Sequence, residues 1–138
     1  MAGYSGTPLP KKLGIREGHR VALLHAPAGF ERTLDDLPGA VTLQSGLSGT
    51  SAFDVIVVFV TRRADLERQL ASMRRRMDPA AGLWVAWPKK ASKVPTDMTE
   101  DVVREIALPT GLVDNKVCAI DETWSGLRLV IRLEHRRL

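Results

Sequence analysis

The chain has 138 residues, of which 44% are hydrophobic and 26% are charged, and its formal net charge is +4. This length predicts one domain over residues 1–138, and the hydrophobic fraction excludes an intrinsically disordered chain. The single cysteine excludes an internal disulfide and a metal site built from a cysteine cluster. No stretch approaches the roughly 20 apolar residues of a membrane span, and no apolar signal core follows the first methionine. We therefore expect a cytoplasmic protein that makes no membrane contact.

The first part of the chain predicts an arm, two strands and one short helix. Residues 1–10 are rich in glycine, proline and hydroxyl side chains, which is typical of an N-terminal arm. An apolar run predicts the first strand over residues 20–25. A loop of small residues then leads to a short helix over residues 30–34. A proline-glycine turn precedes a short second strand over residues 40–44.

The most regular pattern of the chain lies between residues 53 and 90. β-Branched residues crowd the apolar run 55–60, which is typical of a strand covered on both faces. Thr61 is expected to cap the helix that follows. The apolar side chains of this helix share one face, at spacings of four, three and four: Leu66, Leu70, Met73 and Met77. Pro79 cannot continue the helix, and a further strand is predicted over residues 83–87.

The last third of the chain predicts one helix and a hairpin. Asp97 and Glu100 match a capping box that opens a helix over residues 98–108. Strands over residues 116–120 and 127–133 flank a short loop, which suits an antiparallel hairpin. The strand-helix-strand unit before them predicts a right-handed crossover between parallel strands. The predicted fold class is therefore α/β: a three-layer, Rossmann-like, mostly parallel sheet of about six strands with an antiparallel last strand.

The turn after the first strand is where an open α/β sheet usually holds a cofactor, through several glycines. In this chain the turn contains only Gly29, and Pro27 lacks the backbone N–H that a phosphate would use. The second strand ends at Gln44, where a cofactor-binding sheet often carries an acid for a ribose hydroxyl. The sequence therefore predicts no cofactor.

Polar and aromatic side chains gather where the predicted strands end, because the carboxyl ends of parallel strands share one edge of the sheet. The candidate ligand-binding residues at this edge are His25, Gly29, Thr61, Arg62, Trp87, Lys89, Lys90, Asp121, Glu122, Thr123 and Trp124. Lysines beside carboxylates and aromatic walls suit a small anionic or amphipathic molecule. The alternative is that the carboxylates only pair with the lysines and hold two loops together, while the tryptophans cover the core.

No catalytic residue set is predicted. His25 could act as a general base, but at the end of a buried strand a histidine is more often a hydrogen-bonded structural residue. Cys118 lies within an apolar strand, where burial raises the pKa of a thiol, so we expect it to be unreactive. His19 and His135 lie too far from His25 in the sequence to indicate a metal site, and no metal ligands are predicted.

The order of the predicted elements resembles a shortened Rossmann-like methyltransferase. Residues 53–133 carry the resemblance through a helix, a strand and an antiparallel final strand inserted beside its predecessor. The resemblance implies S-adenosylmethionine bound at the end of the first strand, through an acid and several glycines. The matching stretch here, residues 23–29, agrees with that motif only at Gly29. Gln44, in place of an acid at the end of the second strand, is a further departure.

A second resemblance covers nearly the whole chain and connects it with a bacterial family catalogued as a domain of unknown function. It is carried by residues 4–9, 83–90, 94–104 and 117–127. This resemblance implies no particular activity, so it leaves the prediction of function to the residues themselves.

Three functions stay open. The main hypothesis is a non-catalytic domain that binds a small anionic molecule or a protein partner at the carboxyl edge. The first alternative is a small methyltransferase-like enzyme with a degenerate cofactor site, using the edge around His25, Lys89 and Asp121. The second is nucleic-acid binding through the arginine-rich helix, by Arg62, Arg63 and residues 74–76; no basic groove lined with aromatic rings supports it. An exposed edge beyond the short second strand would also permit a homodimer.

Overall fold

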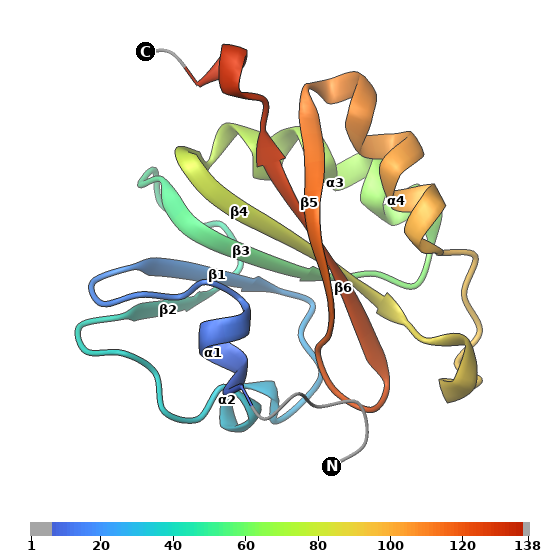
Figure 1. Ribbon diagram of the computed structural model, residues 1–138, viewed down its shortest axis with the longest axis horizontal. Coiled ribbons are helices and arrows are strands. Elements are labelled where there is room, and N and C mark those ends of the chain that lie inside the picture. The colour runs from blue at the N-terminus through green and yellow to red at the C-terminus, as the bar shows by residue number, and fades with distance from the viewer. Residues whose placement is uncertain (1–6, 137–138) are drawn as a thin grey trace.

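The computed structural model describes residues 7–136, which form a six-stranded sheet with helices on both faces (Figure 1). The strands are β1 (Arg20–Leu24), β2 (Thr42–Ser45), β3 (Phe53–Phe59), β4 (Met77–Pro88), β5 (Leu112–Ala119) and β6 (Trp124–Ile131). The helices are α1 (Leu9–Lys12), α2 (Phe30–Thr33), α3 (Arg63–Arg75) and α4 (Glu100–Ala107). None of these helices is long or apolar enough to cross a membrane.

The strands lie in the order β2-β1-β3-β4-β6-β5. β6 runs antiparallel to both of its neighbours, and the other adjacent pairs are parallel. This arrangement confirms the predicted α/β class, with a mostly parallel sheet and an antiparallel last strand. β2 and β5 form the two outer edges of the sheet.

Two separate hydrophobic cores lie on the two faces of the sheet. On one face, Leu9 of α1 and Phe30 of α2 pack with Val57 and Trp84 of the central strands. The opposite face is covered by α3 and α4, whose buried residues Leu66, Leu70, Met73, Val103 and Ala107 pack with residues such as Ile56. β3 is buried on both faces, which explains why its sequence is a continuous apolar run.

The end of the predicted N-terminal arm, residues 9 and 10, packs against the sheet. The first part of the arm, residues 1–6, lies outside the described residues. Leu9 and Pro10 begin α1 and are buried, and Leu9 belongs to the core that also contains Phe30 of α2. Residues 9 and 10 therefore belong to the folded domain.

Several strands differ in extent from the sequence prediction. β4 begins at Met77 rather than at residue 83, and the sheet pairing moves from Phe53–Met77 to Val55–Gly82 across a bulge. Pro79 is tolerated there because a bulge requires no hydrogen-bond donor from it. Met77 consequently belongs to the strand instead of the helix. β6 ends at Ile131 rather than at residue 133, so Leu133 lies outside the strand and is 74% exposed.

Both predicted helix caps are wrong, and the reason is tertiary. Arg62, rather than Thr61, is the residue that precedes α3, and its side chain makes no capping hydrogen bond. Instead Asp97, which we expected to cap α4, accepts a hydrogen bond from the backbone N–H of Arg63 at 2.7 Å. Thr99 caps α4 by accepting from the N–H of Val102 at 3.1 Å. The loop after β4 is thereby attached to the start of α3.

We predict that Asp97→Ala lowers the free energy of unfolding by about 1–2 kcal/mol, because the N–H of Arg63 at the start of α3 loses its acceptor. Urea denaturation followed by circular dichroism measures this loss. Glu122→Ala is the control, because Glu122 is exposed and makes no ion pair within residues 7–136. Equal unfolding midpoints for the two variants would contradict the assignment of Asp97 as a cap.

Candidate functional site

The loops that follow β3, β4 and β5 are hydrogen-bonded to one another at the carboxyl edge of the sheet. The N–H of Val60 donates to the carbonyl of Ala86 at 2.9 Å, and the N–H of Lys89 donates to the carbonyl of Thr123 at 2.7 Å. The carbonyl of Thr61 accepts from the hydroxyl of Thr96 at 2.6 Å. These bonds position the side chains of three loops relative to one another.

A hollow of about 370 Å³ opens at this edge, between the ends of β1 and β3. From β1 the chain crosses to β2 on one side, and from β3 it crosses to β4 on the other side. A reversal of this kind leaves a crevice at the ends of the two strands, which is where open α/β sheets bind ligands. We call this the switch-point hollow; its lining residues are His25, Phe59, Val60, Thr61, Asp65, Arg68, Gln69 and Trp124.

Aromatic rings form one wall of the switch-point hollow. The rings of Phe59 and Trp124 meet edge to face, with centroids 5.1 Å apart. Phe59 in turn meets Phe30 of α2 at 4.8 Å, also edge to face. The wall therefore continues into the core on the α2 side of the sheet, and packing fixes its position.

Polar groups of the hollow come from the end of β1 and from α3. His25 is exposed and has a left-handed backbone conformation, with φ 59°, which a non-glycine residue adopts at some cost. The side-chain amide oxygen of Gln69 is buried and has no hydrogen-bond partner among the described residues. Asp65 and Arg68 form an ion pair with each other. The hollow therefore offers an aromatic surface beside unused hydrogen-bonding groups.

The expectation that His25 is a hydrogen-bonded structural residue is wrong. β1 ends at Leu24. The left-handed backbone conformation of His25 directs its imidazole away from the core. The imidazole makes no hydrogen bond within residues 7–136. The ring lines the switch-point hollow and is accessible from it.

The eleven predicted site residues do not form one pocket. His25, Thr61 and Trp124 share the switch-point hollow. Arg62 lines a second hollow beside Thr96 and Asp97. Trp87 and Lys90 line a third hollow, which also contains Met98 and Glu100. Trp87 is 7% exposed and packs into the α3–α4 core, so it lies on the opposite face of the sheet from Trp124. Alternation of side chains along the strands separates the two rings.

Of the remaining predicted residues, three act through their backbone in the described structure, and a fourth has no role in it. Gly29 has φ 83° and precedes α2. The carbonyl of Thr123 accepts the N–H of Lys89. Glu122 is exposed and lines none of the three hollows at this edge.

Asp121 stabilises the turn of its own hairpin. One oxygen of its carboxylate accepts the N–H groups of Thr123 and Trp124, both at 2.8 Å. No ion pair joins Asp121 to Lys89 or Lys90 in the part of the chain that the structure describes, so the predicted carboxylate–lysine pairing is also wrong. The turn is shorter than the predicted loop, because β6 begins at Trp124. The signal was present in the sequence, since an aspartate often bonds to the backbone two residues later in a turn.

Two arginines of the arginine-rich helix region make contacts within the fold. Arg76 donates to the carbonyl of Ser51 at 2.7 Å, and its guanidinium lies 5.0 Å from the Phe53 ring. Hydrogen bonds with Glu67 and Glu105 raise the pKa of Arg63. Part of the positive charge in this region is therefore engaged internally.

The fold is similar to that of several solved methyltransferases. A putative type 11 methyltransferase from Sulfolobus solfataricus has a TM-score of 0.68 and 12% identity, with 98% of this chain and 96% of that chain covered. A SAM-dependent methyltransferase from Aquifex aeolicus has a TM-score of 0.65 and 16% identity, with 88% and 87% covered. The chain has a methyltransferase-like α/β fold. At these identities the similarity concerns the fold alone.

No model of a protein family matches the chain, and no curated protein matches it. The resemblance to the bacterial family of unknown function therefore stays a prediction.

S-adenosylmethionine, which the methyltransferase resemblance implies, does not fit the loop after β1. A Cβ atom on Gly29 would meet only the Arg32 side chain, at 3.0 Å, so this glycine forms no tight backbone cradle. Pro27 has no N–H to donate. At the end of β2 the amide of Gln44 donates to the carbonyls of Gly46 and Ser48, at 3.1 and 2.8 Å. Gln44 is thus engaged in its own loop.

We predict that Asp121→Ala lowers the free energy of unfolding by about 1–3 kcal/mol, because two backbone N–H groups lose their acceptor. Asp121→Asn keeps an acceptor oxygen and should lose less. Urea denaturation of both variants beside Glu122→Ala makes the comparison. A fully stable Asp121→Ala variant would show that the turn does not depend on the carboxylate.

Cys118 should react slowly with iodoacetamide at neutral pH. Burial raises the pKa of its thiol, and this outweighs the lowering by Lys12 and Lys116, so less of the reactive thiolate is present. We expect alkylation to be several-fold slower in the native protein than in urea, and to accelerate as the pH rises. Equal rates in the two states would refute this expectation. Mass spectrometry of timed samples gives both rates.

Proposed function

We propose that this protein is a methyltransferase-like domain that binds a small molecule in the switch-point hollow. One observation carries the proposal. An aromatic wall and unpartnered polar groups lie together between the ends of β1 and β3, where the crossovers to β2 and to β4 leave in opposite directions. The volume of about 370 Å³ lies within the range of small-molecule sites.

The lining favours a planar ring that carries hydrogen-bonding substituents. Trp124 and Phe59 supply aromatic surface, and the amide of Gln69 lacks a partner that a ligand would provide. Asp65 and Arg68 compensate each other, so the hollow carries little net charge. A nucleoside combines these properties better than a small anion does, and this revises the expectation drawn from the lysines of the edge.

Methyl transfer is the second candidate function. The fold favours it: a fibrillarin from Aeropyrum pernix with natively bound S-adenosyl-L-methionine has a TM-score of 0.60 and 11% identity, with 92% of this chain and 70% of that chain covered. The loop after β1 and the end of β2 do not supply the usual contacts to that cofactor. If the protein transfers methyl groups, the switch-point hollow would supply most of the free energy of S-adenosylmethionine binding, and the affinity for that cofactor would be weak.

Gln69→Met is the sharpest test of the switch-point hollow, because methionine has nearly the same shape and no polar amide. The buried oxygen has no partner in the free protein, so its removal should raise the melting temperature. The same change should weaken adenosine binding about tenfold, since a hydrogen bond to the ligand is lost. Differential scanning fluorimetry and isothermal titration calorimetry measure the two effects.

Ser72→Ala, on the exposed surface of α3, is the control and should bind adenosine as the wild type does. Adenosine and S-adenosylhomocysteine are the probes, and labelled S-adenosylmethionine tests for methyl transfer. Binding of neither probe by the wild type, or unchanged binding by Gln69→Met, would reject the proposed site. Binding without methyl transfer would reject the second candidate alone.

A further inference from the structure

We propose that another hollow, at the opposite edge of the sheet, binds a phosphate group. Its volume is about 280 Å³. Asp54, near the start of β3, and Ala80, in the first half of β4, place it at the amino ends of the parallel strands. We call it the arginine hollow; its lining residues are Gly14, Arg16, His19, Asp54, Ala80 and Arg128.

Arg128 occupies its position because residue 82 is a glycine. Arg128 on β6 pairs with Trp84 on β4, and its side chain lies diagonally across β4 over Gly82. A Cβ atom on Gly82 would lie 2.5 Å from Nε and 2.9 Å from Cζ of Arg128. The backbone of Gly82 is not left-handed, so its conformation does not require glycine. The missing side chain makes room for the guanidinium.

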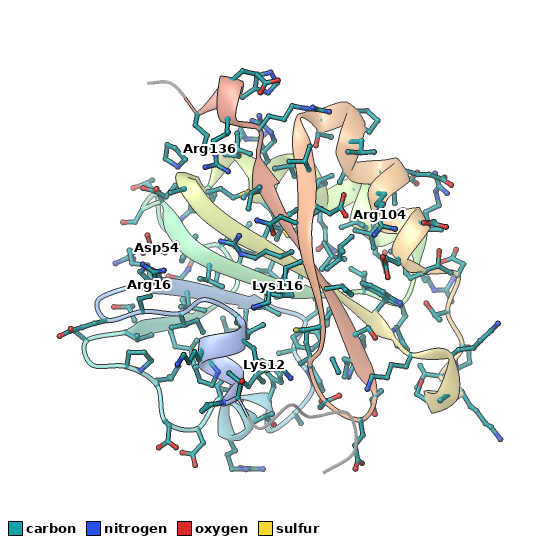
Figure 2. The ribbon with its side chains drawn as sticks, viewed as in Figure 1. Lys12, Arg16, Asp54, Arg104, Lys116 and Arg136 are labelled. Atoms are coloured by element: carbon teal, nitrogen blue, oxygen red, sulfur yellow. The ribbon has the colours of Figure 1, made fainter. Side chains whose placement is uncertain are left out.

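The guanidinium of Arg128 is half-buried and makes neither an ion pair nor a hydrogen bond within residues 7–136. Burial lowers the pKa of Arg128, and so do the nearby charges of Arg136 and Arg16. Arg136 is held in place by its own hydrogen bond to the carbonyl of Ile131, at 2.7 Å. Figure 2 shows Arg16 and Asp54 beside each other, with Arg136 on the same side of the molecule. Three arginines therefore gather without a carboxylate bound to any of them in the described residues.

The other polar groups of the arginine hollow are compatible with an anion. Asp54 is the one carboxylate among the lining residues, and it accepts the N–H of Arg20 at 2.8 Å. The Nδ1 atom of His19 accepts the N–H of Arg16 at 3.1 Å, so a neutral His19 carries its proton on Nε2 and remains a donor. Arg16 and Arg128 line the hollow and the charge of Arg136 acts on Arg128, so positive charge exceeds that of the single carboxylate.

Phosphate is the group that this arrangement suits best. Guanidinium groups bind phosphate oxygens through paired, charge-assisted hydrogen bonds, and they do so more strongly where water is partly excluded. No Phe, Tyr or Trp side chain lines the hollow, so the broad stacking surface that single-stranded nucleic acid uses is missing from it. The volume leaves room for a small organic group beside the phosphate. A phosphomonoester is therefore the ligand class that we infer.

Gly82→Ala tests the inference without changing the charge of the protein. The new methyl group would displace the end of the flexible Arg128 side chain, while the strand backbone accepts alanine. We expect the dissociation constant for inorganic phosphate to increase about tenfold or more, as it should in Arg16→Gln. Arg75→Gln, on the exposed surface of α3, removes one charge elsewhere and should leave binding unchanged.

Isothermal titration calorimetry with sodium phosphate gives the dissociation constants, and melting temperatures in phosphate are compared with those in sodium chloride of equal ionic strength. Circular dichroism confirms that each variant is folded. The inference is overturned if phosphate stabilises the wild type no more than chloride does. It is equally overturned if Arg75→Gln weakens binding as much as Gly82→Ala. Neither result depends on the switch-point hollow.

Discussion

The parallel pairing of β3 with β4 is the interaction on which the rest of the structure depends. Val57 pairs with Trp84, and neither side chain is accessible to solvent. The two strands separate the hydrophobic cores, and helices cover both faces, so the buried residues of the pair cannot be exposed without opening a core. The hollow at each end of the sheet takes its shape from this rigid pair. Both proposed sites are therefore built on the most buried element of the fold.

A methyltransferase-like sheet can form a crevice at its carboxyl edge without the features that hold the usual cofactor. The crevice at the carboxyl edge arises from strand order, because the crossovers from β1 and β3 leave in opposite directions. A site for the usual cofactor adds several glycines after β1 and an acid after β2 to that crevice. This chain has neither the full set of glycines nor the acid. A fold of this kind supports different functions through the side chains of its loops. The aromatic wall of Phe59 and Trp124 is one such difference.

Carboxylates near the strand ends show why a pattern of polar residues overestimates a binding site. Asp121 was a candidate ligand-binding residue, and Asp97 was expected to cap α4. In the structure each one satisfies backbone N–H groups at a loop or helix end. Buried or partly buried N–H groups must find acceptors, and a nearby carboxylate is a strong one. Gly82 presents the opposite case, since it drew no attention in the sequence and yet makes room for Arg128.

Local patterns in the sequence were sufficient for the type and order of the main elements. The β-branched run before Thr61 and the apolar stripe of Leu66, Leu70 and Met73 depend on neighbours within a few residues, so the chain itself displays them. The caps, the bulge near Pro79 and the split of Trp87 from Trp124 depend on partners far along the chain. The hydrogen-bond partners of the caps and the faces on which the two rings lie are determined only when the sheet assembles. For that reason neither hollow could be predicted from the sequence.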